Sequence, residues 1–269
     1  MFPNLTFFKQ NHTVLRVLLP FFIPFLTSCE KVLDIKLKDS ESRIVIEGNL
    51  SDQPGPYTVK LSRSVGFNDP NVFPAITNAT VIISDNTGNI DTLAEAEPGT
   101  YLTKTLQGVP GRNYFLRVII DNQQFDAVSG MPAPVTILDI RVEKFRFNEK
   151  EKAVVINFQD PAGIKNYYRA FYIVNGKASD QLLYLSDEFQ DGNLLDGDFF
   201  DNDMLLKSGD SVKIVLQTIN EQMFNYIREQ DQLGNSQISS PANPTSNISN
   251  NALGYFSAHA ETSASIVVP

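Results

Sequence analysis

The stretch Arg43–Val65, RIVIEGNLSDQPGPYTVKLSRSV, decides the fold class. In its second half, Tyr57, Val59 and Leu61 are separated by polar residues, so they fall on one face of an extended chain. The first half alternates in the same way, and Gln53–Pro56 between the halves is rich in turn-forming residues. The stretch therefore predicts two β-strands joined by a turn, each with one face in a core.

Further strand patterns follow this stretch at short intervals, separated by turn residues and without a convincing helix. This arrangement is typical of an immunoglobulin-like β-sandwich, which we predict over residues 43–131. The chain has one cysteine and no tryptophan, so it is not an antibody-type domain with a disulfide and a buried tryptophan. The predicted strands are Thr80–Ser84, Ile90–Leu93, Thr100–Leu106, Asn113–Asp121 and Phe125–Ser129.

Pro132 and Pro134 mark a domain boundary, because proline is excluded from central strands and stiffens linkers. Beyond it, residues 135–269 predict a second β-rich domain with one helix. The helix is expected from Glu221 to Leu233, with Asn220 as its N-cap and Gly234 at its end. The predicted strands are Thr136–Phe147, Lys152–Gln159, Asn166–Asn175, Leu182–Leu185, Ser211–Ile219, Tyr255–Phe256 and Ala264–Val268, with a turn at Asn148–Glu151.

The composition limits the classes of function. The 269 residues include 31 acidic and 22 basic side chains, a net charge of −9, which argues against a nucleic-acid-binding protein. One cysteine and two histidines exclude multi-cysteine metal sites and leave little for histidine-based catalysis. No phosphate-binding glycine loop, nucleophile elbow or zinc-protease motif is present. We therefore expect a non-catalytic binding or structural protein.

The first residues have the form of a secretory signal. A basic flank with Lys9 and Arg16 precedes the apolar run Val17–Leu26, which is too short and too proline-rich to span a membrane. Leu26-Thr27-Ser28-Cys29 then resembles a bacterial lipobox, which implies cleavage before Cys29 and lipid attachment to it. We predict a signal peptide over residues 1–28 and a tether over residues 29–42. The alternatives are a general secretory signal with an incidental cysteine or a buried structural cysteine.

The segment Asp187–Asp203, DEFQDGNLLDGDFFDND, holds seven acidic residues and no basic one. Carboxylates in this density suit calcium, with Asp196, Asp198 and Asp201 as candidate ligands, but the spacing does not fit an EF-hand loop. The apolar residues within the segment favour a solvated acidic loop packed on the domain, and we predict no cofactor. A pair of carboxylates for glycoside hydrolysis is a further alternative that spacing alone does not identify.

Aromatic residues are concentrated in the strand Asn166–Asn175. Tyr168 and Tyr172 have opposite parity from Tyr167 and Phe171, so one pair is expected in the core. The other pair is either covered or free to bind a glycan or peptide. His259, in a predicted strand, is expected to be structural or exposed rather than catalytic.

The order of several motifs resembles a family of Bacteroidota outer-membrane lipoproteins, domain of unknown function 4249. The resemblance spans nearly the whole chain after the signal peptide. Its features are the lipobox, Ile44–Leu50, Pro54–Val59, Ser186–Gly192, the Gly209–Val212 strand start and the Asn-rich loop ending in Leu253–Ala258.

The resemblance implies a location and a partner. Members are generally lipoproteins encoded beside TonB-dependent receptors, which implies a lipid-anchored accessory or ligand-binding partner of such a receptor in nutrient uptake. It implies no catalytic residue. The alternative is a structural or adhesive cell-surface lipoprotein in which the sandwich is a spacer. Glu30-Lys31 and the following residues match an acidic surface-export signal poorly, so the periplasmic and surface faces of the outer membrane both stay open.

Overall fold

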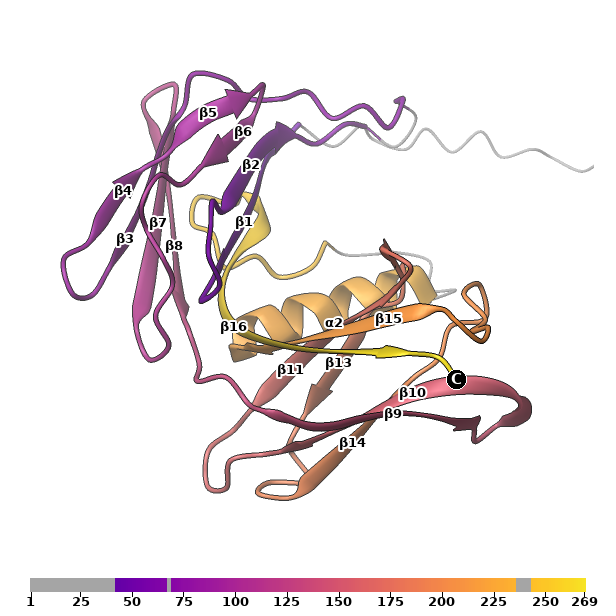
Figure 1. Ribbon diagram of the computed structural model, residues 1–269. Coiled ribbons are helices and arrows are strands. Elements are labelled where there is room, and N and C mark those ends of the chain that lie inside the picture. The colour runs from indigo at the N-terminus through magenta and orange to yellow at the C-terminus, as the bar shows by residue number, and fades with distance from the viewer. Residues whose placement is uncertain (1–41, 67–68, 236–242) are drawn as a thin grey trace, which may run out of the picture. The chain divides into compact units, whose positions relative to one another are not determined.

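Strands form most of the regular structure in the computed structural model, which describes residues 42–66, 69–235 and 243–269 (Figure 1). The described helix is α2 (Glu221–Asn235). The strands are β1 (Ile44–Ser51), β2 (Thr58–Arg63), β3 (Thr80–Asp85), β4 (Ile90–Thr92), β5 (Ala94–Glu97), β6 (Thr100–Leu102), β7 (Asn113–Ile120), β8 (Gln123–Gly130), β9 (Ile137–Phe145), β10 (Asn148–Gln159), β11 (Tyr167–Val174), β12 (Lys177–Ala178), β13 (Leu183–Ser186), β14 (Leu194–Phe199), β15 (Ser211–Ile219) and β16 (Leu253–Val267).

The first sandwich encloses its core between two antiparallel layers. One layer is the four-stranded sheet β4-β3-β7-β8, and the other is the β1-β2-β6-β5 end of a nine-stranded sheet. Alternation along each strand supplies the core: Tyr114, Leu116, Val118 and Ile120 of β7 are buried, while the residues between them are more exposed. The predicted β-sandwich is confirmed.

The second half forms another pair of layers around a separate core. The three-stranded sheet β14-β10-β9 packs on the β12-β11-β15-β16 end of the nine-stranded sheet. Val154, Ile156 and Phe158 of β10 enter this core together with Tyr168 and Tyr172 of β11. The predicted hairpin between β9 and β10 is confirmed by the antiparallel pairing of the two strands. Its turn lies at residues 146–147 and not at Asn148–Glu151, because β10 already begins at Asn148 and a register irregularity between Asn148 and Lys152 absorbs the polar residues.

β16 joins the two halves. Its first part pairs in parallel with β1, from Val45 opposite Leu253 to Ser51 opposite His259, and its second part pairs antiparallel with β15. The predicted pair of strands at Tyr255–Phe256 and Ala264–Val268 is therefore wrong, since both belong to one 15-residue strand. The intervening residues are small or polar, so they lack the hydrophobic alternation that identifies a strand.

The residues of the two cores follow the predicted domain limits except at the C-terminal end of the chain. Residues 44–131 supply most of the first core, and Val135 begins the second. Phe256, Ala258 and Ala260 of β16 nevertheless lie in the first core, whereas Val268 lies in the second. The C-terminal segment thus completes both cores.

The predicted helix is present and begins at Glu221 as expected, but α2 runs to Asn235, so the prediction that it ends at Gly234 is wrong. The backbone N–H of Met223 donates to the Asn220 side-chain oxygen at 2.9 Å, which is the N-cap hydrogen bond. Met223, Phe224 and Ile227 form one apolar face and pack with Ile219 in a third cluster. Within the described residues, no helix has the length and apolar character needed to cross a membrane.

Candidate functional site

The structure describes the predicted calcium ligands but not the predicted lipid-attachment site. Cys29 lies outside the described residues, as do the predicted signal peptide and all but the last residue of the tether. The expectation of a loop over the whole acidic segment is wrong, because residues 194–199 form β14, which pairs with β10. Leu195 and Phe199 enter the second core and hold this strand on the sheet.

The three candidate calcium ligands each have a protein partner. Asp196 on β14 accepts a hydrogen bond from the Asn157 side chain, and Asp198 forms an ion pair with Arg146. Asp201 is buried beyond the strand, where it accepts the Ser179 hydroxyl at 2.6 Å and the backbone N–H of Asp203 at 2.8 Å. These contacts tie β14 and the following turn to their neighbours. The structure does not bring the three carboxylates together.

A different carboxylate group does converge. One oxygen each of Asp160, Asp187 and Asp191 lies within 4.8 Å of the other two. Asp187 and Asp191 belong to the acidic segment, but Asp160 follows β10 and was not predicted. The Asp160-Pro161-Ala162-Gly163 turn directly after a strand is the signal in the sequence that could have drawn attention to it.

Asp160 and Asp187 differ in how many hydrogen bonds their carboxylate oxygens accept. Asp160 is buried and accepts the Tyr168 hydroxyl at 2.5 Å and the Gly192 N–H at 2.9 Å, so both of its oxygens are occupied. Burial, together with the Asp160 carboxylate, raises the pKa of Tyr168. Asp187 accepts the Asn166 N–H at 2.8 Å through one oxygen. Three carboxylates could contribute oxygen ligands to a hard cation, but calcium takes roughly six to eight oxygens, so they are an incomplete calcium site.

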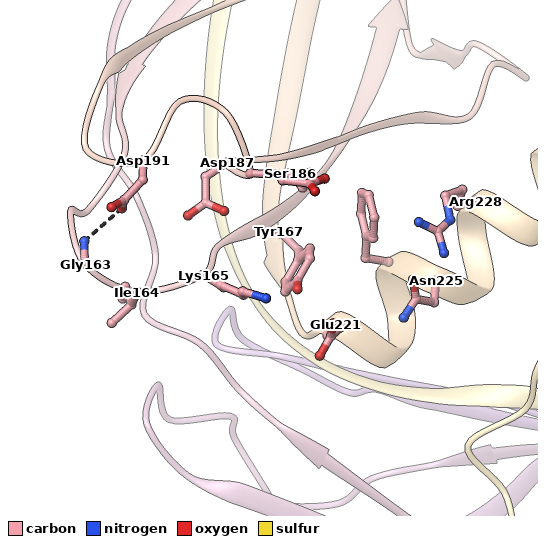
Figure 2. Close-up of a pocket in the computed structure, with 12 residues that line it drawn as sticks. Gly163, Ile164, Lys165, Tyr167, Ser186, Asp187, Asp191, Glu221, Asn225 and Arg228 are labelled. Carbon is pink, nitrogen blue, oxygen red and sulfur yellow. Dashed lines mark hydrogen bonds between the residues drawn. The ribbon is translucent and has the colours of Figure 1, made fainter.

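Asp187 and Asp191, but not Asp160, border a cavity of about 430 Å³ at the N-terminal half of α2 (Figure 2). Three segments line it: the turn before β11, the turn after β13, and the first two turns of the helix. Figure 2 shows the residues of these segments around a common space, with the Asp191 carboxylate accepting the Gly163 N–H at 2.8 Å. The charged lining residues are Lys165, Asp187, Glu188, Asp191, Glu221 and Arg228.

Aromatic rings form one wall of the cavity. The ring centres of Tyr167 and Phe224 are 5.0 Å apart, and those of Tyr184 and Phe224 are 5.6 Å apart. The Arg228 guanidinium lies 5.7 Å from the centre of the Phe224 ring. Burial and the Glu221 carboxylate raise the pKa of Tyr167 above its ordinary value.

The prediction that one pair of aromatic residues in β11 lies in the core is confirmed, and a residue of the other pair lines the cavity. Tyr168 and Tyr172 are buried in the second core. Tyr167 lies on the other face of β11 and contacts α2. Phe171 shares that face, and the Arg169 guanidinium lies 4.4 Å from its ring centre. The two aromatic residues outside the core therefore have different surroundings: Tyr167 lines the cavity, and the Arg169 side chain covers Phe171.

A second hollow adjoins the first. Its volume is about 320 Å³, and it shares Lys165, Tyr167 and Glu221 with the larger cavity. Beyond these residues it reaches Arg112 and Asn113 at the end of the first sandwich. The two hollows therefore offer an elongated space that passes Tyr167.

His259 forms a row with two polar residues of β16. Its Nδ1 lies 3.2 Å from the Ser257 hydroxyl and its Nε2 lies 3.1 Å from a Glu261 carboxylate oxygen. The row resembles a serine-histidine-acid arrangement, but Ser257 is 2% exposed and His259 is 4% exposed. Gln217 also lies within hydrogen-bond distance of His259 and Glu261. This network joins β15 to β16 inside the protein, where no substrate reaches Ser257.

Three of the solved structures that match the chain are remote from it in sequence. A two-domain fibronectin type III segment from chicken tenascin is 9% identical, covering 85% of this chain and 100% of that chain, with a TM-score of 0.25. The chicken interferon gamma receptor alpha chain is 7% identical, covering 85% and 98%, with a TM-score of 0.26. A DUF4785 family protein from Legionella pneumophila is 11% identical, covering 65% and 52%, with a TM-score of 0.26.

No curated protein is significantly similar to the chain in sequence. A family model does match it, over residues 30–265, which includes both sandwiches and the helix. The chain belongs to the family described as Domain of unknown function (DUF4249).

Proposed function

We propose that the protein is a lipid-anchored outer-membrane lipoprotein without catalytic activity, which binds a ligand and passes it to a TonB-dependent receptor in nutrient uptake. The lipobox at Cys29 and the resemblance to Bacteroidota lipoproteins support the anchor and the partner. The observation that carries the binding role is the cavity beside Tyr167, whose aromatic wall and charged rim are typical of ligand sites.

The buried His259 row supports the absence of catalysis. A serine nucleophile has to reach the reacting carbonyl of its substrate, and the Ser257 hydroxyl lies inside the sheet. The carboxylates beside the cavity are held by backbone N–H groups and the Tyr168 hydroxyl, which fix their positions. This pattern is consistent with recognition of a ligand.

Labelling with an alkyne-bearing fatty acid in a bacterial host tests the anchor. The full chain should incorporate the label and fractionate with the outer membrane, whereas the Cys29→Ser variant should incorporate none. Equal labelling of both proteins, or release of the wild type as a soluble protein, would contradict lipid attachment at Cys29.

Affinity purification of the solubilised lipoprotein tests the partner. An outer-membrane barrel receptor should co-purify with the wild type after cross-linking. The Cys29→Ser variant is the matched control for co-localisation, because it carries the same folded domains without the lipid. Repeated recovery of the lipoprotein without any barrel protein would count against the receptor partnership.

One observation favours the alternative, a structural or adhesive surface lipoprotein. Phe147 at the tip of the β9-β10 hairpin is 80% exposed and packs edge-on against Phe145, which in turn stacks on Phe200 at 3.9 Å between ring centres. Exposed aromatic side chains are frequent contributors to protein interfaces. Loss of cell adhesion in the Phe147→Ala variant, with ligand binding unchanged, would favour this alternative.

A further inference from the structure

We infer that the cavity beside Tyr167 takes a short peptide, with its free amino group at Asp187 and its carboxylate end at Arg228. The inference rests on the ligand-binding role proposed above and names the chemical class of the ligand. Its basis is the position of two side chains without an ion pair among the described residues, Asp187 and Arg228, on opposite sides of the cavity with aromatic rings between them (Figure 2). Lys165, Glu188 and Glu221 also line the cavity.

Asp187 provides the acidic end. Asp187 is only 3% exposed, yet its carboxylate faces the cavity, as Figure 2 shows. One oxygen accepts the Asn166 N–H, and among the described residues no cationic side chain lies within ion-pair distance of it. A buried carboxylate without a countercharge is costly. An ammonium group would supply both the charge and the hydrogen-bond donors, and Asp191 lies close enough to share it.

Lys165 does not fill this role in the structure. It lines the same cavity, but its side chain runs below Tyr167 and its amine points away from Asp187 and Asp191 (Figure 2). The ion pairs within the described residues all involve other side chains. The amino group that neutralises Asp187 would therefore come from a ligand.

Arg228 provides the basic end. It projects from the second turn of α2 on the side of the cavity opposite the two aspartates, next to Asn225 (Figure 2). Its guanidinium lies beside the Phe224 ring and has no ion pair among the described residues. The planar donor fork of arginine matches a carboxylate, which a peptide carries at the end opposite its amino group.

The space between the ends suits peptide side chains. Tyr167 and Phe224 offer apolar ring faces, and the adjoining hollow past Lys165 and Glu221 leaves room for further residues. A neutral glycan could stack on the same rings, but it would leave the buried Asp187 carboxylate without a countercharge, whereas the exposed Arg228 is solvated. The charges therefore favour a peptide over a neutral glycan.

Randomised tripeptide mixtures test the inference on the purified full chain. One mixture keeps both ends free, a second is N-acetylated, and a third is C-amidated. Binding is followed by thermal shift and by mass spectrometry of the retained peptides. We expect blocking either end to weaken binding by about 10-fold or more, since each block removes a charge-assisted contact.

Two variants assign each end of the peptide to its residue. Asp187→Asn should bind free and N-acetylated peptides equally while still distinguishing amidated ones, and Arg228→Gln should show the reverse. Asp121→Asn and Arg63→Gln, which make the same changes of charge outside the cavity, should behave as the wild type. A merely structural role for Asp187 or Arg228 would weaken all three mixtures alike.

Other outcomes overturn the inference. Equal binding of the free and end-blocked mixtures would exclude charged-end recognition. Binding of maltotetraose that is lost in Tyr167→Ala, without peptide binding, would replace the peptide by a glycan and leave the proposed ligand-binding function intact. Binding of neither class, together with failure to recover a receptor, would overturn both the inference and the proposed function.

Discussion

Gly254 lies opposite Ile46 in the parallel pairing of β16 with β1, so close that a Cβ on Gly254 would overlap the carbonyl oxygen of Ile46. Gly254 also has a φ of +91°, which side-chain-bearing residues rarely adopt. Two residues further along the same pairing, a Cβ on Gly48 would lie 2.9 Å from Phe256. Both glycines belong to motifs that carry the family resemblance, and the structure gives a reason for each: a Cβ on Gly254 would meet the Ile46 backbone, and a Cβ on Gly48 would meet the Phe256 ring.

Gly254→Ala should therefore destabilise the protein strongly. The left-handed backbone alone costs an alanine about 1–2 kcal/mol, and the overlap with Ile46 adds to this by forcing β1 and β16 apart. Gly88→Ala is the matched control, because Gly88 has a φ of +95° with no atom near the added Cβ. Urea denaturation measures both changes, and similar losses in the two variants would show that the close approach to Ile46 is unimportant.

The stability of the first sandwich should depend on pH through Asp91. This buried carboxylate accepts the N–H groups of Lys104, Thr105 and Leu106 at 2.8–2.9 Å. Burial raises the pKa of Asp91, but the three N–H groups and the charge of Lys104 outweigh it, so the net pKa is lowered. A lowered folded-state pKa adds stability above the unfolded value, about 3.9, and that stability is lost as the pH falls through the folded-state pKa.

Asp91→Asn should lower the free energy of unfolding at pH 7 by about 1–3 kcal/mol, since a neutral amide accepts these N–H groups less well. The variant should also lose less stability than the wild type when the pH falls from 5 to 2. Asp121→Asn, at an exposed turn, serves as the control. Parallel pH profiles for wild type and Asp91→Asn would contradict this role of Asp91.

Tyr168→Phe should reveal the contribution of the hydrogen bond to Asp160. The hydroxyl donates to a buried carboxylate at 2.5 Å, so its removal leaves one Asp160 oxygen without its donor. We expect a loss of about 1.5–3 kcal/mol in the free energy of unfolding, the range for a hydrogen bond to a charged group. Tyr172→Phe, on the same face of β11, should cost less, because within the described residues the Tyr172 hydroxyl has no such carboxylate hydrogen bond. If Tyr168→Phe and Tyr172→Phe lowered the free energy of unfolding equally, the hydrogen bond to Asp160 would not be the cause of the loss.

Ser257 should not react with serine-hydrolase reagents. A fluorophosphonate probe has to reach the hydroxyl, and this residue is 2% exposed inside the β15-β16 network. We expect no labelling of the folded full chain, with Ser257→Ala giving the same result in mass spectrometry. Labelling of the wild type that disappears in Ser257→Ala would contradict the non-catalytic assignment.

Local sequence patterns predicted much of the fold, because the relevant interactions act over short distances in the chain. Alternation in Ile44–Ser51 and Asn113–Ile120 placed apolar residues on one face, and the strands form there. Asn220 caps the helix through a hydrogen bond to a residue three positions away. β14 was missed because two aspartates and a glycine conceal a strand whose Leu195 and Phe199 are buried.

The candidate site could not be predicted in the same way, because its parts meet only in the folded chain. Asp160 joins Asp187 and Asp191 because β10 and β13 end near the same turn, and Tyr167 faces Phe224 because α2 packs on β11. The sequence by itself determined most of the strands, the helix and the acidic character of the segment after β13. Only the tertiary structure decided which carboxylates converge, which tyrosine lines the cavity, and that the segment from β16 to Val268 completes both cores, since these depend on pairings between residues far apart in the chain.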